Sequence, residues 1–253
     1  MHFLYPCLPY RPRTVDPMWE PEYEWARAQG LATGLVDLDN DKVWVPTLAP
    51  ATQPQVLYRG WMLTAAEYAR LAQLLPLAVS PAEYLSSHHA TGWYEAVAPH
   101  TFPSRFLSEP AVLDFAAGRR YFVKGLVKSF GQDSVLSAQG QLDSFWQRQE
   151  LPAGTPLFVR DFVELKPDSE RRFFVVRGQA YGTGGAMLPT SLWAAVAALK
   201  PRLFYSFDVA ETIAGQPVLV EVGAGQVSDL KEWSVAEFGS RVLRTLAEVN
   251  DIS

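Results

Sequence analysis

The chain has 253 residues, of which 48% are hydrophobic and 19% are charged, and its formal net charge is −5. This composition is typical of a globular protein with a sizeable core, and the acidic balance excludes the broad basic surface that nucleic-acid binding needs. Cys7 is the only cysteine, which excludes a disulfide framework and a cysteine-based zinc site. The start has no signal-peptide pattern and no apolar run reaches about 18 residues, so we expect a cytoplasmic protein with no membrane span.

Residues 1–104 are expected to form a small N-terminal α/β domain. Its expected strands are His2–Tyr5, Leu35–Leu38 and Gln55–Tyr58. Its expected helices are Pro21–Gln29 and a second one that follows Thr64 and runs to about Leu75. Thr64 and Glu67 have the spacing of a capping box at the start of that second helix. Alternating strands and helices predict a parallel sheet covered by helices.

Residues 105–253 are expected to form a second, α+β domain. Its expected strands are Arg120–Lys128, Pro156–Glu164, the hairpin Arg171–Gly178 and Gln179–Gly182, and two strands on either side of Gly215 and Gln216. Its expected helices are Ala111–Ala117, Gln139–Gln149, Ser191–Leu199 and Ser234–Glu248. The fold class is therefore α/β with α+β subdomains.

Two carboxylates, Asp208 and Glu221, lie within the apolar strands that flank the Gly215 turn. Acidic side chains are rarely buried without a cationic partner or a metal. Hard oxygen ligands on neighbouring strands suit Mg²⁺, which takes one or two carboxylates and completes its shell with nucleotide phosphates. The alternative is a hairpin whose two carboxylates face solvent.

Lys124 and Lys128 lie four residues apart in an expected strand, which places both on one face. Two cations on one face repel each other unless an anion lies between them, and a triphosphate would satisfy both. The alternative is an exposed strand edge, where lysines commonly prevent edge-to-edge pairing.

Arg172 stands where the buried strand Phe173–Val176 begins. An arginine at the mouth of a strand can clamp a phosphate or a carboxylate with two parallel hydrogen bonds. The alternative is a surface ion pair, which contributes little to stability.

Taken in chain order, these residues resemble the ATP-grasp superfamily over roughly residues 105–250. The motifs that carry the resemblance are Lys124, Arg160-Asp-Phe-Val163, Glu170-Arg-Arg172-Phe-Phe-Val-Val, Asp208 and Glu221-Val-Gly223. Segments of the first 104 residues resemble the ATP-grasp clade that is named for one arginine and two lysines. The matching residues here are Arg172, Lys124 and Lys128.

The resemblance implies a fold in which two subdomains clamp ATP, joined by a hinge near residues 160–164. Lys124 would contact the nucleotide phosphates, whereas Lys128 and Arg172 would act in catalysis. The backbone of Arg160, Asp161, Phe162 and Val163 would bind the adenine edge, with Phe162 and Val163 lining the base pocket. Either Glu164 or Glu170 would reach the ribose hydroxyls.

The resemblance also implies a metal site made by Asp208 and Glu221. The usual superfamily pattern is Glu-x-Asn, in which the asparagine is a further metal ligand. This chain has Gly223 at that position. Either Gln226 or water would then take the place of the asparagine, or a single metal ion would bind tightly.

The function implied is that of a ligase that joins a carboxylate to an amine with ATP and Mg²⁺ through an acyl phosphate, releasing ADP and phosphate. A kinase on the same scaffold, or a nucleotide-binding module with weak catalysis, is the alternative. We expect a small-molecule or peptide substrate and neither a nucleic acid nor a membrane as partner. The oligomeric state is not predicted. The side chains that suggest an anionic or bulky substrate are Arg59, Arg105, Lys128, Trp61, Trp93 and Tyr94.

Overall fold

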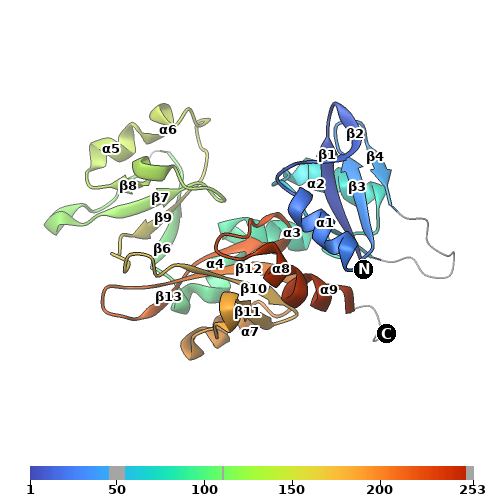
Figure 1. Cartoon of the computed structure of the whole chain (residues 1–253). Coiled ribbons are helices and arrows are strands. Elements are labelled where there is room, and N and C mark those ends of the chain that lie inside the picture. The colour runs from blue at the N-terminus through green and yellow to red at the C-terminus, as the bar shows by residue number, and fades with distance from the viewer. Residues whose placement is uncertain (46–54, 110, 249–253) are drawn as a thin grey trace.

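The computed structural model of the chain describes residues 1–45, 55–109 and 111–248 (Figure 1). Within these residues, the strands form an N-terminal sheet, an outer sheet and a central sheet. The mixed α/β architecture agrees with the fold class that the sequence predicts. No helix in this part of the chain combines the length and the apolar character that crossing a membrane requires.

The N-terminal sheet contains the parallel pairs that the sequence predicts. Strand β1 pairs in parallel with β3 and β5, and the antiparallel strands β2 and β4 complete the sheet. The strands are β1 (His2–Leu8), β2 (Arg11–Val15), β3 (Thr33–Asp37), β4 (Lys42–Trp44) and β5 (Val56–Tyr58). Helices α1 (Glu20–Ala28) and α2 (Ala65–Leu74) belong to the same region. The capping box of Thr64 and Glu67 is confirmed at the start of α2.

The outer sheet is antiparallel and follows the order β6-β9-β7-β8. Its strands are β6 (Ser104–Leu107), β7 (Tyr121–Lys124), β8 (Val135–Leu136) and β9 (Leu157–Asp161). One face packs on the short helices α5 (Gln139–Asp143) and α6 (Phe145–Arg148), through a core that includes Val123, Phe145 and Val159. The opposite face therefore carries the alternate residues of these strands, among them Lys124 and Arg160.

The central sheet is antiparallel with the order β11-β10-β12-β13. Its strands are β10 (Arg171–Val176), β11 (Gln179–Gly182), β12 (Phe204–Glu211) and β13 (Pro217–Ala224). The predicted hairpin is confirmed: Arg177 and Gly178 both have positive φ, which is the backbone of a tight two-residue hairpin turn. The predicted turn at Gly215 also joins β12 to β13, with φ +76° at the glycine.

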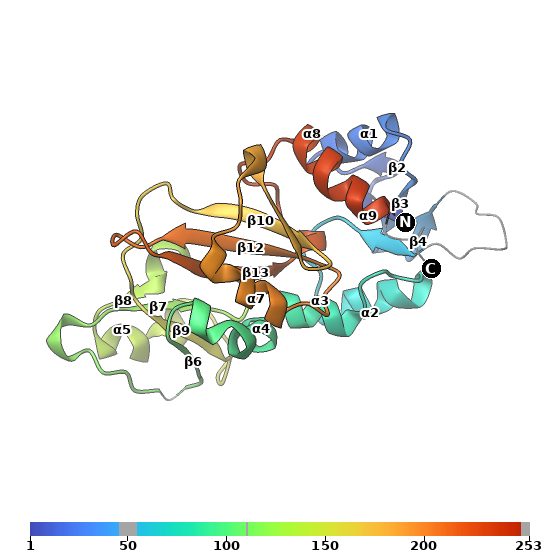
Figure 2. The same ribbon diagram turned by 90° about the horizontal axis from the view of Figure 1, so that it is seen from below.

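Each face of the central sheet has its own apolar core. On one face, Phe173, Phe207 and Val222 pack with α4 (Ala90–Val97) and α7 (Trp193–Ala198), which Figure 2 shows against the sheet. On the other face, Phe174 and Phe204 share a core with the N-terminal sheet and with the C-terminal helical segment. That segment comprises α8 (Val235–Phe238), a π-helical turn (Gly239–Leu243) and α9 (Arg244–Glu248).

The division between the two domains at residue 104 remains a prediction. Two helices that precede residue 104 pack against the central sheet. Helix α3 (Pro81–His88) contacts β13, and Trp93 of α4 lies in the core of the central sheet. Residues 81–97 thus cover the sheet of the second domain, although they lie within the first 104 residues.

Two expected elements are wrong. The expected strand Arg120–Lys128 ends at Lys124, because the chain turns there and the amide of Gly125 donates to the carbonyl of Lys128 at 2.8 Å. The expected helix Ala111–Ala117 is only a 3-10 turn at Ala116–Gly118, where Ala117 adopts positive φ. Further 3-10 turns lie at Ala98–His100, Gly131–Ser134, Thr183–Gly185, Thr190–Leu192 and Gly225–Val227.

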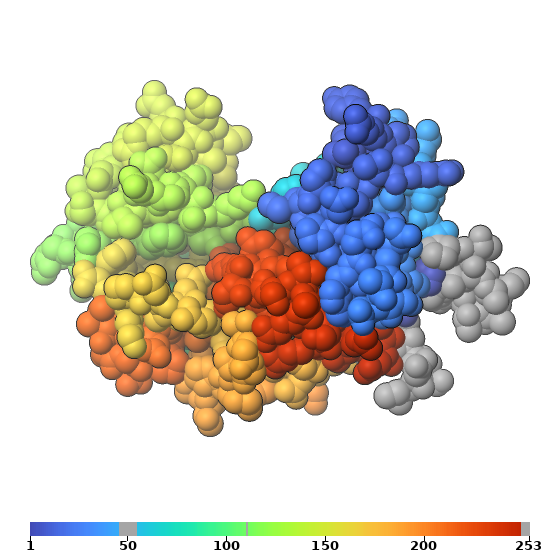
Figure 3. Space-filling view, viewed as in Figure 1, coloured from blue at the N-terminus to red at the C-terminus, as the bar shows by residue number. Residues whose placement is uncertain are grey.

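The outer and N-terminal sheets stand side by side over the central sheet (Figure 1). The space-filling view shows a hollow between these two lobes, and residues of the C-terminal third form its floor (Figure 3). Side chains on the upper face of the central sheet therefore lie where all three parts of the molecule meet.

Candidate active site

Three charged side chains lie in one row across the central sheet. Arg172 on β10 pairs in register with Asp208 on β12, and Asp208 pairs in register with Glu221 on β13. Residues directly opposite in an antiparallel sheet project to the same face with neighbouring Cβ atoms. The register of the central sheet thus brings together residues that are 49 positions apart in sequence, from Arg172 to Glu221 (221 − 172).

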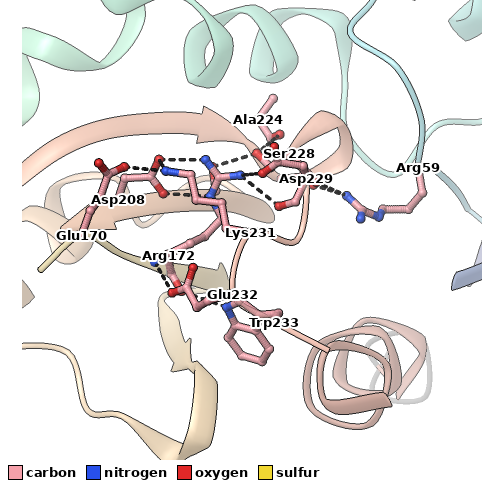
Figure 4. Close-up of polar contacts among 12 residues, drawn as sticks. Arg59, Glu170, Arg172, Asp208, Ala224, Ser228, Asp229, Lys231, Glu232 and Trp233 are labelled. Atoms are coloured by element: carbon pink, nitrogen blue, oxygen red, sulfur yellow. Dashed lines mark hydrogen bonds and ion pairs between the residues drawn. The ribbon is translucent and has the colours of Figure 1, made fainter. Parts of the chain in front are cut away.

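Asp208 is buried and accepts hydrogen bonds from two cations (Figure 4). Arg172 donates from Nε to Oδ1 at 2.8 Å and from Nη2 to Oδ2 at 2.7 Å, and Lys231 Nζ lies 2.9 Å from Oδ2. Burial opposes ionisation of this carboxyl, but the bonds and charges of Arg172 and Lys231 outweigh burial, so the pKa of Asp208 falls below its usual value. Asp208 is therefore an anion in the folded protein at neutral pH.

Arg172 is held from both sides. Besides Asp208 it binds the carboxylate of Asp229, and its Nη1 donates to the carbonyl of Asp229 at 2.9 Å. Its own amide donates to Glu232 at 2.8 Å. Burial lowers the pKa of Arg172, yet the bonds to Asp208 outweigh that effect and the pKa lies above its ordinary value. The side chain is 11% exposed, so the alternative of a loose surface ion pair does not describe it.

Lys124 reaches from the outer sheet to the central sheet. Its Nζ donates to Oε1 of Glu221, and the lysine is almost fully buried whereas the side chain of Glu221 is about one-third exposed. Burial lowers the pKa of Lys124, the charge of Glu221 opposes that shift, and the nearby charge of Arg160 adds to it. The resemblance assigns Lys124 to the nucleotide phosphates and Glu221 to the metal. In the structure these two side chains bind each other.

Arg160 is the second buried cation of the outer sheet. It is 4% exposed, and neither Nε nor Nη2 has a hydrogen-bond partner among the described residues. Its guanidinium lies over the rings of Phe158, at 5.0 Å, and Phe102, at 5.7 Å. Burial lowers its pKa to about 10. Buried polar atoms without partners are costly, so the acceptors of a bound nucleotide would relieve this site.

The expected hinge follows β9. The amide of Phe162 donates to the carbonyl of Arg120 at 3.0 Å, and the guanidinium of Arg120 lies 4.1 Å from the centre of the Phe162 ring. Asp161 and Phe162 line a surface pocket of about 270 Å³ together with residues 118–121. Val163 is partly exposed, at 39%. Of the four residues assigned to the adenine edge, Asp161 and Phe162 thus line this pocket, whereas Arg160 and Val163 are not among its lining residues.

The two candidate ribose ligands have different surroundings. Glu164 is exposed and pairs with Arg120 at 3.0 Å. Glu170 binds Lys231, and both residues line a pocket of about 510 Å³ whose other walls are residues 165–169, Arg171 and Ala210. Glu170 is thus connected to the Asp208 cluster, which favours it over Glu164.

Lys128 does not share a strand face with Lys124, and the reasoning from strand periodicity was wrong. Because β7 ends at Lys124, Lys128 lies exposed in the following turn. The turn nevertheless returns the chain beside Lys124, since Ser129 pairs with Lys124 and the carbonyl of Lys128 accepts from the amide of Gly125. Burial, His89, Lys128 and Lys124 together lower the pKa of His88 to about 4.

Gly223 is required by its neighbours. A Cβ added there would lie 2.6 Å from Oγ of Ser206 and 3.2 Å from Oγ of Ser228. These two hydroxyls bond each other at 2.8 Å, so they occupy the space that the usual asparagine side chain would need. Gln226 is buried and its amide donates to the hydroxyl of Tyr68 on α2 at 3.4 Å. No described contact joins Gln226 to the carboxylates.

The donor set fits magnesium bound together with a nucleotide. Within the described residues no group of three or more His, Cys, Asp or Glu side chains could hold a metal ion alone. Asp208 and Glu221 offer hard oxygens in direct register, and Oε2 of Glu221 accepts no hydrogen bond from the described residues. Two carboxylates with phosphate oxygens are a usual magnesium environment.

Two contributors were missed by sequence reasoning, and a third was misplaced. Lys231 and Asp229 lie in the loop after β13, in the run Ser228-Asp-Leu-Lys-Glu232, where the concentration of charge beside Glu221 was the available signal. Arg59 was expected near the mouth of the site. Instead it is fully buried, binds both carboxylate oxygens of Glu22 at 2.8 and 2.6 Å, and donates to the carbonyls of Gly225 and Ser228.

Comparison with protein families gives one match that covers most of the chain. The model of the ATP-grasp domain of family 3, in the clade named for one arginine and two lysines, matches residues 49–246. No curated protein matches the chain.

Solved structures of ATP-grasp proteins superpose on nearly the whole chain. A D-cycloserine synthetase superposes with a TM-score of 0.63 at 13% identity, covering 98% of this chain and 99% of that chain. A macrocyclase from Microcystis aeruginosa MRC, bound with a precursor peptide, gives 0.60 at 13% identity and covers 100% of both chains. The D-alanine–D-alanine ligase from Coxiella burnetii gives 0.60 at 12% identity, covering 98% of this chain and 93% of that chain. At such identities the likeness establishes the fold.

Proposed function

Since this chain belongs to family 3 of the ATP-grasp clade named for one arginine and two lysines, we propose that it is an ATP-dependent ligase that joins a carboxylate to an amine through an acyl phosphate. The observation that carries the proposal is the row Arg172, Asp208 and Glu221, with Lys124 reaching it from the outer sheet. Two hard carboxylates and several cations at the meeting of two sheets suit a magnesium-bound triphosphate.

Nucleotide binding is assigned to both sheets. In the proposal Lys124 and the free nitrogens of Arg160 bind phosphate or base acceptors, since both cations face the central sheet from the outer one. The backbone of Asp161, Phe162 and Val163 binds the adenine edge, and Glu170 binds the ribose. Asp208 and Glu221 hold magnesium, which would neutralise the phosphate charge; Gln226 is left out because its side chain contacts Tyr68 on α2.

The first chemical step would transfer the terminal phosphoryl group. A carboxylate oxygen of the substrate forms a bond to the γ-phosphorus, the bond from that phosphorus to the β,γ-bridging oxygen breaks, and ADP leaves with the electron pair. Attack of one anion on another needs positive charge around the transferring group. Arg172 supplies a permanent positive charge for it from its place beside Asp208, and Lys128 supplies an exposed ammonium in the turn after β7.

The second step would form the new bond between carbon and nitrogen. The amine nitrogen attacks the acyl carbon, phosphate leaves with its bonding electrons, and the amine gives up one proton. Acyl phosphates are labile in water, so approach of the outer sheet to the central sheet would protect the intermediate. In the proposal a second substrate would approach through the hollow between the lobes (Figure 3).

The names of the structural relatives support amino acids and peptides as the substrate class. These relatives include a D-alanine–D-alanine ligase and a macrocyclase bound with a precursor peptide. A carboxylate and an amine on such molecules are the groups that the proposed chemistry joins.

The test is a screen of amino acids and short peptides for release of ADP that depends on the acceptor. For a substrate that responds, a carboxylate labelled with ¹⁸O should transfer one labelled oxygen to inorganic phosphate, because that oxygen bridges carbon and phosphorus in the intermediate. Label that stays in a phosphorylated product would indicate a kinase instead. ADP release that no acceptor stimulates, with tight nucleotide binding, would indicate a binding module. Glu221→Gln serves as the inactive control.

A further inference from the structure

Lys231 joins two carboxylates of the site from a loop outside the strands. Its ammonium lies 2.9 Å from Oδ2 of Asp208 and also binds Oε1 of Glu170 (Figure 4). The residue has positive φ, +46°, a conformation that is uncommon for a lysine. The loop therefore holds Lys231 in an unusual backbone conformation while its ammonium contacts Asp208.

The oxygen that Lys231 contacts is the one that already accepts a bond from Arg172 Nη2. Two cations thus share Oδ2 of Asp208, while Oδ1 is bound by Arg172 Nε. The two cations differ in how firmly they are held. Arg172 is 11% exposed and is fixed on its other side by Asp229, whereas Lys231 is 32% exposed and has a flexible stem. Lys231 is the one that can leave without disrupting a buried network.

We infer that Lys231 is a positioning residue that occupies Oδ2 of Asp208 until a divalent cation displaces it. The inference rests on the proposed function in one respect, since it takes Asp208 as a metal ligand. A divalent cation that approaches Oδ2 meets the Lys231 ammonium 2.9 Å from that oxygen, and the repulsion between the two charges opposes metal binding. Metal binding therefore requires the ammonium to withdraw, and Glu170, its second partner, offers it a place.

The displaced ammonium remains beside the pocket of residues 165–171, which both Lys231 and Glu170 line. There it adds positive charge next to the nucleotide that arrives with the metal. Lys231 thus weakens binding of a metal alone and favours binding of metal and nucleotide together. Its removal should change these two affinities in opposite directions, which loss of a merely structural contact would not do.

The test measures binding of Mn²⁺ alone to the full chain by electron paramagnetic resonance, and nucleotide affinity separately by calorimetry. We expect Lys231→Met to bind Mn²⁺ about tenfold more tightly, because the electrostatic competition at Asp208 is removed, and to bind the metal–nucleotide complex several-fold more weakly. Lys231→Arg keeps the charge, so it should bind Mn²⁺ alone, and the metal–nucleotide complex, with affinities close to those of the wild type. Lys166→Met is the matched control: it removes a lysine that pairs with Glu211 at 2.9 Å, and its Mn²⁺ affinity should stay unchanged.

An unchanged or weaker Mn²⁺ affinity in Lys231→Met would overturn the inference, and so would an equal gain in Lys166→Met. If Lys231→Met does not fold, Lys231→Gln replaces it in the same measurement. Absence of Mn²⁺ binding in every variant would also overturn it, because the competition at Asp208 requires a site that binds the metal alone. A wild-type protein that binds Mn²⁺ but never turns over ATP contradicts the proposed ligase function, while the metal titration still decides the role of Lys231.

Discussion

The ammonium of Lys124 on β7 and the carboxylate of Glu221 on β13 form an ion pair that connects the outer sheet to the central sheet. In the proposed function these groups have different ligands, since the lysine binds phosphate and the carboxylate binds magnesium. In the ion pair, each group neutralises the charge of the other; with a magnesium nucleotide bound, phosphate would neutralise the lysine and magnesium would neutralise the glutamate. Breaking one partner of a largely buried pair leaves the other uncompensated, so single substitutions at these positions act on both sheets.

Glu221→Gln should abolish magnesium-dependent turnover while the protein stays folded. The amide keeps the shape of the side chain but loses the negative charge that the metal needs. Activity should be measured over a range of magnesium concentrations, with circular dichroism as the check on folding. Wild-type rates at limiting magnesium would contradict the metal assignment. Asp208→Asn should cause a smaller or similar loss that raised magnesium partly restores.

Lys124→Ala and Lys128→Ala should have different kinetic effects. Lys124 is buried against Glu221, so its loss should weaken nucleotide binding about tenfold or more. Lys128 is exposed in the turn after β7, so its loss should lower the turnover number more than the nucleotide affinity. Calorimetric titration of a non-hydrolysable nucleotide gives the affinities, and steady-state kinetics gives the rates. Equal losses of affinity, with no separate effect on rate at Lys128, would contradict this division.

Arg172→Lys should lower both turnover and stability. Lysine keeps the charge but cannot reproduce the paired bonds to Asp208 together with the bonds to Asp229. Loss of charged hydrogen bonds at a mostly buried residue should cost about 1–3 kcal/mol of the free energy of unfolding. Urea denaturation measures that loss. Arg171, the neighbouring position, is the control: it is exposed, and among the described residues its side chain donates only to the backbone carbonyls of Asp168 and Glu170, so Arg171→Lys should be nearly silent.

Gly223→Ala should destabilise the protein, although alanine is small. Its Cβ would press on Oγ of Ser206 at 2.6 Å and disturb the bond between Ser206 and Ser228. Overpacking of this kind costs about 1–3 kcal/mol. The double variant Gly223→Ala with Ser206→Ala removes the hydroxyl that clashes and should recover part of the loss. A single variant as stable as the wild type would show that the space beside Gly223 is not restrictive.

The stability of the protein should fall in acid, in part because of Asp208. Its folded pKa lies below the unfolded value, because Arg172 and Lys231 outweigh burial. A carboxyl group whose pKa is lowered by folding stabilises the folded state. This contribution is complete above the pKa of the unfolded chain, about 3.9, and it is lost as the pH falls through the pKa of the folded state. Urea titrations at pH 7, 5, 4 and 3 should show the decline. Asp208→Asn should be less stable at pH 7 and should lose less between pH 4 and pH 3.

Local signals in the sequence predicted much of the fold. Thr64 and Glu67 predicted a helix start because both halves of a capping box lie within one turn. Asp208 and Glu221 were found because each interrupts an apolar strand, and a carboxylate in that setting needs a partner. Strand periodicity failed at Lys128 because it assumes a continuous strand, whereas the chain turns directly after Lys124 and the amide of Gly125 bonds the carbonyl of Lys128.

The remaining parts of the site depend on contacts between distant positions. The partner of Arg59 is Glu22, 37 residues earlier, and nothing local to Arg59 indicates that it is buried. Lys231 occupies a loop whose course is set by the packing of Trp233 and Phe238 against Phe174. Only the folded chain shows that this loop returns to Asp208.

The contacts of Arg59 limit how the first part of this chain can be exchanged between relatives. Arg59 donates to the carbonyls of Gly225 and Ser228. The residue after Ser228 is Asp229, whose carbonyl and carboxylate bind Arg172. A chimaera that receives its first 60 residues from another protein would need an arginine and a glutamate matched to this loop. Without them the donor segment could fold correctly and still leave the loop that carries Asp229 and Lys231 without its anchor.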